Sequence, residues 1–539
     1  MWGWRSSRTF VIGTAVVIFA VCSVLPVAYL FLTSLTGISA AGAALLLDAR
    51  QRTLMYNTTL LGMGTAVLST VIGAPLGIAL ARVPIKRKAA IRVVLAAPML
   101  LPPYIVALAW IYLGARGGFL ADSDGVASWI YSLPAAILVL SLVFFPLSML
   151  ATEVGLRRID GRLEEAALVV AAPRRVLRRI TLPLAAPGIA AAALVVFVLA
   201  VSEFGVPGLL RVRVYTTEVF TAFAALYDFS RAIVLAVPLL TLCAVVAAVA
   251  ARLLGDRLVS PRRLTGSYPP LFDQWGRGAR LAIVVVVAVA VVLPVVALAR
   301  EAVNVRVVRA AFDGSGEAIA NSLILSAAGA TVVTAVAGCL GYGRARARNR
   351  IASLADTLFI VLFAVPSTIV GVGLIGLWNR PGVFGAIYGS DSMFILAYLA
   401  RFVPVAALIF AAAVLYVPVS HEEAAAAAGA GWLRTMSRIV LPQLRLGLAA
   451  TWIVVFVLSF GELGASVLIA PPGESTLPIH IYTIIANAPP AQVAALALLQ
   501  ALVIFTPLAV LGTVASLRPS TLRQAQGRAL RQAQGREDH

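Results

Sequence analysis

Two glutamates lie deep in apolar segments and are the side chains of this sequence best suited to handle a charged solute. Glu203 follows Ser202, and Glu462 follows Gly461, at equivalent positions 259 residues apart and well inside two long apolar segments. An ionisable group at membrane depth is costly and marks a functional site by default. Two carboxylates facing one axis would offer hard oxygen ligands to a hard cation. An equally weighted alternative is that each glutamate caps or braces a helix, for instance by pairing with Arg401.

Two polar loops carry a second pattern, in which a pair of glutamates opens an alanine-rich stretch. One copy lies at 163–183 and the other at 421–442. Each predicts a short helix with glutamate at its start, where the helix dipole favours anions, then a break and a second segment ending at a Leu-Pro stop. Because alanine side chains are small, a partner surface could approach such a helix closely. A simple helical hairpin is the alternative, and it would suffice for one isolated copy.

The sequence lacks the usual motifs for nucleotide binding, metal binding and catalysis. A phosphate-binding loop needs a glycine-rich turn before its lysine, and the only lysines, Lys86 and Lys88, have no glycine near them. The three cysteines fall in apolar segments and the three histidines are widely separated: Cys22, Cys243, Cys339, His421, His480 and His539. We therefore expect no catalytic residue, no metal site and no cofactor in this chain, and we treat the histidines as surface residues.

The composition predicts that most of the chain lies in a membrane. Hydrophobic residues make up 61% of it and charged residues only 12%, about half the charged share of a soluble domain. Apolar runs of the roughly 20 residues needed to cross a bilayer must be helices, because the alternation of a barrel is absent. Twelve spans are predicted, starting near residues 9, 57, 93, 128, 187, 232, 281, 320, 353, 392, 447 and 493.

The net charge of +20 sits in short loops, where it sets the orientation of the spans. The arginine-rich loops at 82–88 and 344–350 are predicted to be cytoplasmic, whereas 471–490 has neither Arg nor Lys and is predicted to lie outside. Both termini are then cytoplasmic, and the first apolar run is a retained helix because it is too long for a cleavable signal. This distribution indicates contact with the lipid bilayer and gives no reason to expect nucleic-acid binding.

The chain contains an internal repeat. Asn57 and Asn321 each open a span, and Ala81-Arg82 and Ala345-Arg346 close them, all at an offset of 264. Later the five residues from Val195 recur from Val454, at an offset of 259. The predicted organisation has a first six-span half at 1–260 and a second at 280–518. A cytoplasmic linker at 261–279 joins them, and a disordered basic tail follows at 519–539. Six is even, so the halves have the same orientation, form a parallel repeat and suggest a pathway on the axis between them.

The two glutamate- and alanine-rich loops at 163–183 and 421–442 resemble the signature of the permease subunits of type I ABC importers. That signature is Glu-Ala-Ala, three residues, Gly, nine residues, Ile, one residue, Leu-Pro. The second loop matches it from Glu423 to Pro442, and the first keeps it except that Ala171 replaces the Gly and one residue is missing. The resemblance implies the type I ABC importer fold and assigns the loops at about 151–187 and 417–446 to coupling with an ATPase.

The resemblance also implies which residues and partners take part. The residues implied for ATPase coupling are Glu164, Glu165, Ala166, Ala167, Ala171, Glu422, Glu423, Ala424, Ala425 and Gly429. A homodimeric ATPase on separate chains would hydrolyse ATP, and a separate extracytoplasmic binding protein would deliver the substrate. The chain would be a multi-pass protein of the bacterial cytoplasmic (inner) membrane. The pathway residues remain those suggested by membrane depth: Ser202, Glu203, Gly461 and Glu462.

The fusion of both halves, with the sequences around Glu203 and Glu462, looks most like the ferric-iron branch of these permeases. Thiamine, phosphonate and polyamine permeases are similar, so these substrates stay open. A secondary transporter of the major-facilitator type also has two six-span halves and is the alternative from another class. Such a transporter would be expected to lack the paired Glu-Ala-Ala loops and to work without an ATPase.

Overall fold

The computed structural model describes residues 2–37, 48–115, 118, 124–254, 275–347 and 349–510. Within these ranges the secondary structure is helical, with no strand. Ten described helices are long and apolar enough to cross a membrane, and the number rises to twelve if each of two bent helix pairs counts as one span. The prediction of an all-α polytopic membrane protein is confirmed. The predicted tail at 519–539 and most of the linker lie outside the described residues.

The first half is built from six spans, several of which consist of two helical pieces. These are α1 (Trp2–Phe19) with α2 (Leu25–Gly37), α4 (Ala49–Arg82), α5 (Lys88–Ala96) with α6 (Pro103–Gly114), α8 (Leu133–Arg157), α10 (Pro173–Val176) with α11 (Leu182–Ser202), and α14 (Phe229–Leu254). Shorter helices join them: α7 (Asp124–Trp129), α9 (Gly161–Val170), α12 (Gly205–Leu209) and α13 (Tyr215–Phe220).

The second half repeats this order. Its spans are α15 (Gly276–Val287) with α16 (Leu293–Glu301), α17 (Val305–Ala345), α18 (Asn349–Phe363) with α19 (Ser367–Trp378), α21 (Ser392–Val414), α23 (Trp432–Thr435) with α24 (Leu441–Phe460), and a final helix at Pro490–Val510. Its shorter helices are α20 (Val383–Tyr388), α22 (Val419–Ala427), α25 (Ser466–Ile469) and α26 (Leu477–Ile484).

The third span of each half is sharply bent, which the hydrophobic pattern did not indicate. The two pieces meet at 88° in the first half and at 93° in the second. Pro102 and Pro366 stand at the two bends, with extended backbone at ψ 129° and 139°. Proline keeps the residue before it out of the helical region, so each helix ends there and restarts after the proline.

The predicted Leu-Pro stops are wrong. The helix runs on through Leu182-Pro183 and Leu441-Pro442, so the fifth spans cover Pro173–Ser202 and Trp432–Phe460 and begin earlier than predicted. A π-helical turn precedes each proline, at Leu177–Thr181 and Met436–Val440. Each proline lies in the first turn of the α-helix that follows, where a missing N–H is tolerated.

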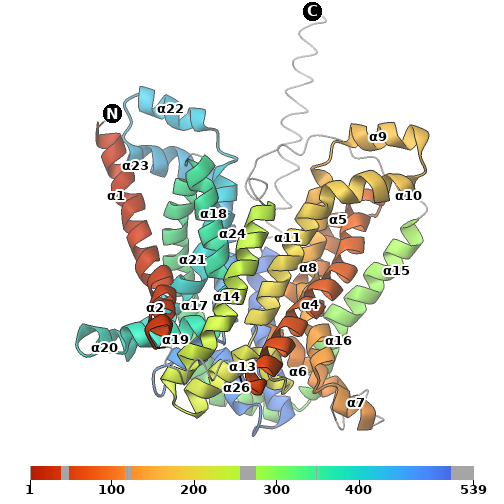
Figure 1. Ribbon diagram of the computed structural model, residues 1–539, viewed down its shortest axis with the longest axis vertical. Coiled ribbons are helices and arrows are strands. Elements are labelled where there is room, and N and C mark those ends of the chain that lie inside the picture. The colour runs from red at the N-terminus through yellow and green to blue at the C-terminus, as the bar shows by residue number, and fades with distance from the viewer. Residues whose placement is uncertain are drawn as a thin grey trace, which may run out of the picture.

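The two coupling loops lie at the same end of the molecule. Figure 1 shows α9 and α22 at one end and α7, α13, α20 and α26 toward the other, with the chain beginning beside α22. Because both loops follow the fourth span of their half, the two halves have the same orientation. This arrangement agrees with a parallel repeat.

The first span of each half packs against the opposite half. The Ser23 hydroxyl donates to the Leu399 carbonyl at 3.2 Å, and the Phe19 and Phe359 rings meet edge to face with centroids 5.5 Å apart. In the other direction α15 packs against α4 and α5, and α16 packs against α6. Buried side chains from both halves form one large hydrophobic cluster. The two sequence repeats are therefore interlocked through a shared core.

Candidate functional site

The paired glutamates of the coupling helices face opposite ways. Glu165 and Glu423 are exposed at the surface of α9 and α22, whereas Glu164 and Glu422 are buried. This follows from the helical period, because adjacent residues are about 100° apart around a helix. Of the residues predicted to couple, the exposed pair is thus free to meet an ATPase directly. Glu164 and Glu422 can act on a partner only through the helix that they hold.

Glu164 lies in a buried three-way junction. Arg82, at the end of α4, donates from Nε to Glu164 Oε1 at 3.2 Å, and its Nη2 lies at ion-pair distance, 2.8 Å, from Oε2. Both side chains are 0% exposed. The same guanidinium donates to the Leu156 carbonyl, at the end of α8, at 2.7 Å. The Thr181 hydroxyl donates to Glu164 Oε1 at 2.9 Å. One arginine therefore joins the ends of the second and fourth spans to the coupling helix.

The second half builds the same junction around Glu422. Arg346, directly after α17, donates to Glu422 Oε1 through Nε at 3.0 Å and Nη2 at 2.7 Å. It also donates to the Val417 carbonyl, just beyond α21, at 2.9 Å. In place of the Thr181 hydroxyl of the first half, the Tyr342 hydroxyl donates to Glu422 Oε2 at 2.7 Å. Arg82 and Arg346 were found in the sequence only as markers of the repeat. The signal that could have indicated their structural role is that both stand at the ends of equivalent spans, at the offset of 264 that relates the two halves.

The two coupling helices end differently. The second ends in a Schellman motif, with Ala430 N–H donating to the Ala425 carbonyl at 2.9 Å and Gly429 at φ +80°. Ala171, which replaces this glycine in the first loop, is extended at φ −145° and ψ 146°. An alanine would be strained in the left-handed region, so the first loop breaks its helix through extended backbone instead.

Apolar side chains around the coupling helices are exposed. On α9, Val169 and Val170 are 84% and 83% exposed, and Leu163 is also exposed. Near α22, Tyr416 and Leu433 are exposed. The predicted alanines vary: Ala166 and Ala424 are exposed, while Ala167 is half-buried and Ala425 is buried. Exposed apolar side chains on polar loops are typical of a surface that a partner covers.

The proposed pathway residues lie where the two halves meet. Ser202 donates to the Ala364 carbonyl, at the bend of the other half, at 3.2 Å. Gly461 packs so closely on the Pro102 bend that an added Cβ would lie 2.8 Å from the proline ring. The broken end of each fifth span thus rests on the bend of the opposite third span.

The two central carboxylates have different partners. Glu462 is buried and pairs with Arg401, whose Nε lies 3.1 Å from its Oε2, as the structural alternative expected. Its Oε1 accepts from Ala465 N–H at 2.9 Å. Glu203 accepts from Gly205 N–H at 2.9 Å, and no described arginine or lysine forms a salt bridge with it. Both glutamates therefore brace the backbone after a broken span, and Glu203 lacks the cation that Glu462 has.

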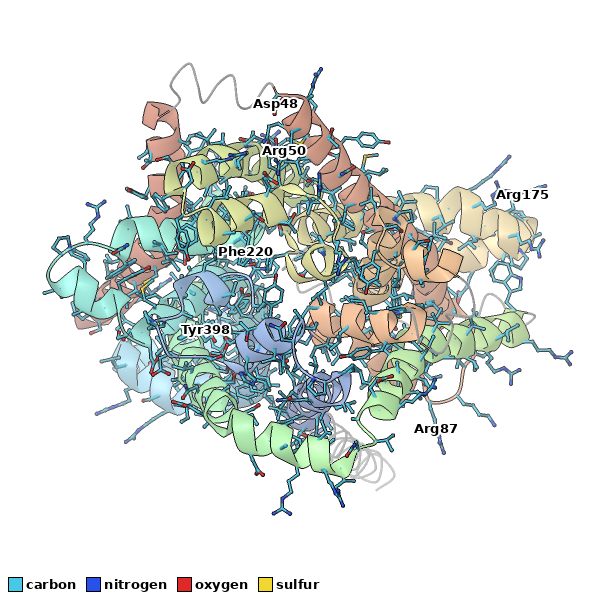
Figure 2. All side chains as sticks on the ribbon, turned by 90° about the horizontal axis from the view of Figure 1, so that it is seen from below. Asp48, Arg50, Arg87, Arg175, Phe220 and Tyr398 are labelled. Atoms are coloured by element: carbon cyan, nitrogen blue, oxygen red, sulfur yellow. The ribbon has the colours of Figure 1, made fainter. Side chains whose placement is uncertain are left out.

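An aromatic cluster joins the halves on the side away from α9 and α22. The Tyr482 ring lies 5.6 Å from Phe204 and 6.4 Å from Phe220, measured between centroids. Figure 2, seen from that side, shows Phe220 near the middle and Arg87 and Arg175 at the rim. Deeper in, the buried Tyr104 hydroxyl bonds the Gln500 amide across the halves. Neither tyrosine was among the candidates from the sequence.

The histidines lie apart from this centre. His480 is half-buried and hydrogen-bonds Ser315 at 3.0 Å, and burial lowers its pKa below the usual value. His421 is exposed beside Gln443. His539 lies outside the described residues. Over the part of the chain that the structure describes, no three His, Cys, Asp or Glu side chains gather as a metal site.

The fold and the repeated loops are those of a transport permease built from two similar halves. Residues 73–260 and 330–516 match the family described as "Binding-protein-dependent transport system inner membrane component". The chain belongs to this family and is an integral inner membrane protein, the permease subunit of an ABC importer. The family implies an ATPase and a substrate-binding protein as partners, so the major-facilitator alternative does not apply.

Relatives extend the match beyond the family. The chain is 23% identical to the Fe(3+)-transport system permease protein FbpB 2 of Haemophilus influenzae over 451 residues, covering 81% of this chain and 85% of that protein. It is 32% identical to the molybdenum transport system permease protein ModB of Escherichia coli over 159 residues, covering 28% of this chain and 69% of ModB. The similarity to FbpB 2 extends over most of the chain, whereas the similarity to ModB is limited to part of it.

Proposed function

We propose that this permease imports ferric iron. The observation that carries the proposal is the similarity to FbpB 2, which covers 81% of this chain. An external binding protein would release iron at the face carrying α13 and α26. A homodimeric ATPase would engage α9 and α22, one subunit on each, on the cytoplasmic side, where both termini would lie.

The charge at the centre supports a cation. With side chains in their ordinary charge states, Glu203, Glu462 and Arg401 together carry one negative charge, because Arg401 offsets only one carboxylate. A passing cation would gain attraction from Glu203 and would meet hard oxygen ligands there. Ser202, Glu203, Gly461 and Glu462 are proposed to border the route, since they lie at the contact between the two halves.

The test is uptake into proteoliposomes that contain the permease, its ATPase and its binding protein. We expect ATP-dependent accumulation of radiolabelled ferric iron, and none of thiamine, a phosphonate or spermidine. Omitting the ATPase or the binding protein should abolish uptake. Import of another of these solutes in place of iron would overturn the substrate while keeping the transport class.

Molybdenum is a second candidate, because ModB has the higher identity where it aligns. Molybdate is an oxyanion and would be drawn to Arg401 instead of Glu203. Radiolabelled molybdate in the same proteoliposomes distinguishes the two substrates. If molybdate is the substrate, Arg401→Gln should reduce uptake more than Glu203→Gln.

A further inference from the structure

We infer that the buried pairs Arg82–Glu164 and Arg346–Glu422 are rigid links that pass the movement of the ATPase to the membrane spans. The inference rests on the proposed docking of an ATPase at α9 and α22. It assigns positioning roles to four buried residues, while the exposed glutamates next to them face the partner.

The geometry of each link makes it stiff. Two nitrogens of the guanidinium lie within 3.2 Å of the carboxylate in each pair. Both partners are nearly or fully buried, at 0% and 0% in the first half and 8% and 6% in the second. A planar guanidinium that contacts a carboxylate through two of its nitrogens is fixed in direction as well as in distance. The ends of the side chains therefore cannot pivot as those of an exposed pair can.

The third contact of each arginine extends the link to another span. Arg82 holds the Leu156 carbonyl at the end of α8, and Arg346 holds the Val417 carbonyl after α21. A shift of the coupling helix must therefore move the ends of the second and fourth spans of that half together, or break a buried ion pair. The additional donors differ, Thr181 in one half and Tyr342 in the other, yet the three-way connection is the same.

Contacts with the first span of the opposite half brace both loops. Arg8 of α1 lies over the Tyr342 ring at 5.7 Å, and Tyr342 bonds Glu422. On the other side, Arg174 of α10 lies over the Trp275 ring, just before α15, at 5.9 Å. Movement at either loop is thus conveyed to both halves.

The test compares Glu164→Gln, Glu422→Gln and the double variant with wild type. The matched control is Glu153→Gln, which weakens another buried carboxylate on this side, bonded by Arg92 at 2.6 Å and Arg157 at 2.7 Å. Arg82→Lys is the second variant, because it keeps the charge but cannot contact Glu164 and the Leu156 carbonyl through separate nitrogens of one planar group. Each protein is measured for melting temperature, binding of the purified ATPase, and ATP hydrolysed per substrate imported.

We expect the Glu164 and Glu422 variants to bind the ATPase within twofold of wild type, because Glu165 and Glu423 are unchanged. ATP hydrolysed per substrate imported should rise about tenfold in the double variant and less in each single variant and in Arg82→Lys. Glu153→Gln should lower the melting temperature without changing the ratio. An unchanged ratio in the double variant, or an equal rise in the control, would overturn the inference.

Hydrogen exchange gives a readout that needs no substrate. On adding ATPase, α9 and the last turn of α4 should both be protected in wild type, and only α9 in Glu164→Gln. Equal protection of the α4 end in both proteins would refute the link. If wild-type permease binds no ATPase, the proposed docking itself is wrong. If it binds and hydrolyses ATP but does not import iron, only the proposed substrate fails.

Discussion

At the scale of single residues, the central site shows how one arginine changes the roles of two equivalent carboxylates. Pro146 of α8 and Pro404 of α21 occupy corresponding positions, which aligns Arg401 with Val143. The second half thus carries a cation that the first lacks. Glu462 forms a salt bridge with that cation, whereas Glu203 accepts from the Gly205 N–H and forms no salt bridge with a described arginine or lysine.

We predict that glutamine at the two positions has different effects. Glu462→Gln should lower stability, because removing one partner of a buried ion pair typically costs about 3–5 kcal/mol. Glu203→Gln should leave the melting temperature close to that of wild type and reduce iron uptake at least tenfold. Melting temperature in detergent and uptake rate are measured on both variants and on the double variant. Normal uptake by Glu203→Gln would rule out its role in the pathway.

At the scale of elements, the coupling helices share a beginning and differ in their ending. Each starts with a paired glutamate whose first member is tied inward. The second ends on a left-handed glycine, and the first ends on an extended alanine. The surfaces around the ends of α9 and α22 therefore differ in shape, although two copies of one ATPase are proposed to bind there.

The glycine break predicts a local effect of Gly429→Ala. Alanine at φ +80° costs about 1–2 kcal/mol, so the loop after α22 should shift to relieve the strain. We expect five- to tenfold weaker ATPase binding with little change in melting temperature, since Gly429 is exposed and no atom crowds its added Cβ. The control is Ala171→Gly, whose extended backbone suits either residue. Equal Kd values for Gly429→Ala and wild type would show that the break does not position the helix.

At the scale of the whole molecule, the two halves are held together because the first span of each half packs against the opposite half. The hydrogen bond from Ser23 to Leu399 and the packing of α15 on α4 place each first span in the opposite half. The large shared cluster of buried side chains follows from this exchange. Movement of one half relative to the other must involve both first spans.

The predicted orientation is tested by chemical labelling. Pro472, before α26, and Leu433, in α23 at the start of the fifth span, are both exposed. The arginine distribution places them on opposite sides of the membrane. In whole cells, Pro472→Cys should react with an impermeant thiol reagent, and Leu433→Cys should react only after the membrane is opened. Wild type is the control, because Cys22 and Cys243 are buried and Cys339 is partly buried. The reverse pattern would invert the topology.

The sequence by itself determined the helical class, the approximate spans, the parallel repeat and the two equivalent loops that carry the Glu-Ala-Ala pattern. These follow from local properties, since apolar runs of membrane length must be helical and a repeated motif marks equivalent loops. It also indicated Arg401 as a partner of a central glutamate. The sequence did not show that Pro102 and Pro366 bend their spans. Nor did it show that the helix continues through Pro183 and Pro442. Proline is compatible with both outcomes, since it can end a helix or occupy the first turn of one.

Only the tertiary structure decided which glutamate of each pair faces inward, which arginine holds it, and which half each first span packs against. Arg82 and Glu164 are 82 positions apart, and Arg346 and Glu422 are 76 apart. Their pairing depends on where the ends of three spans come to lie. Hydropathy and motif spacing describe neighbours along the chain, whereas burial and ion pairing depend on neighbours in space, which exist only once the helices have packed.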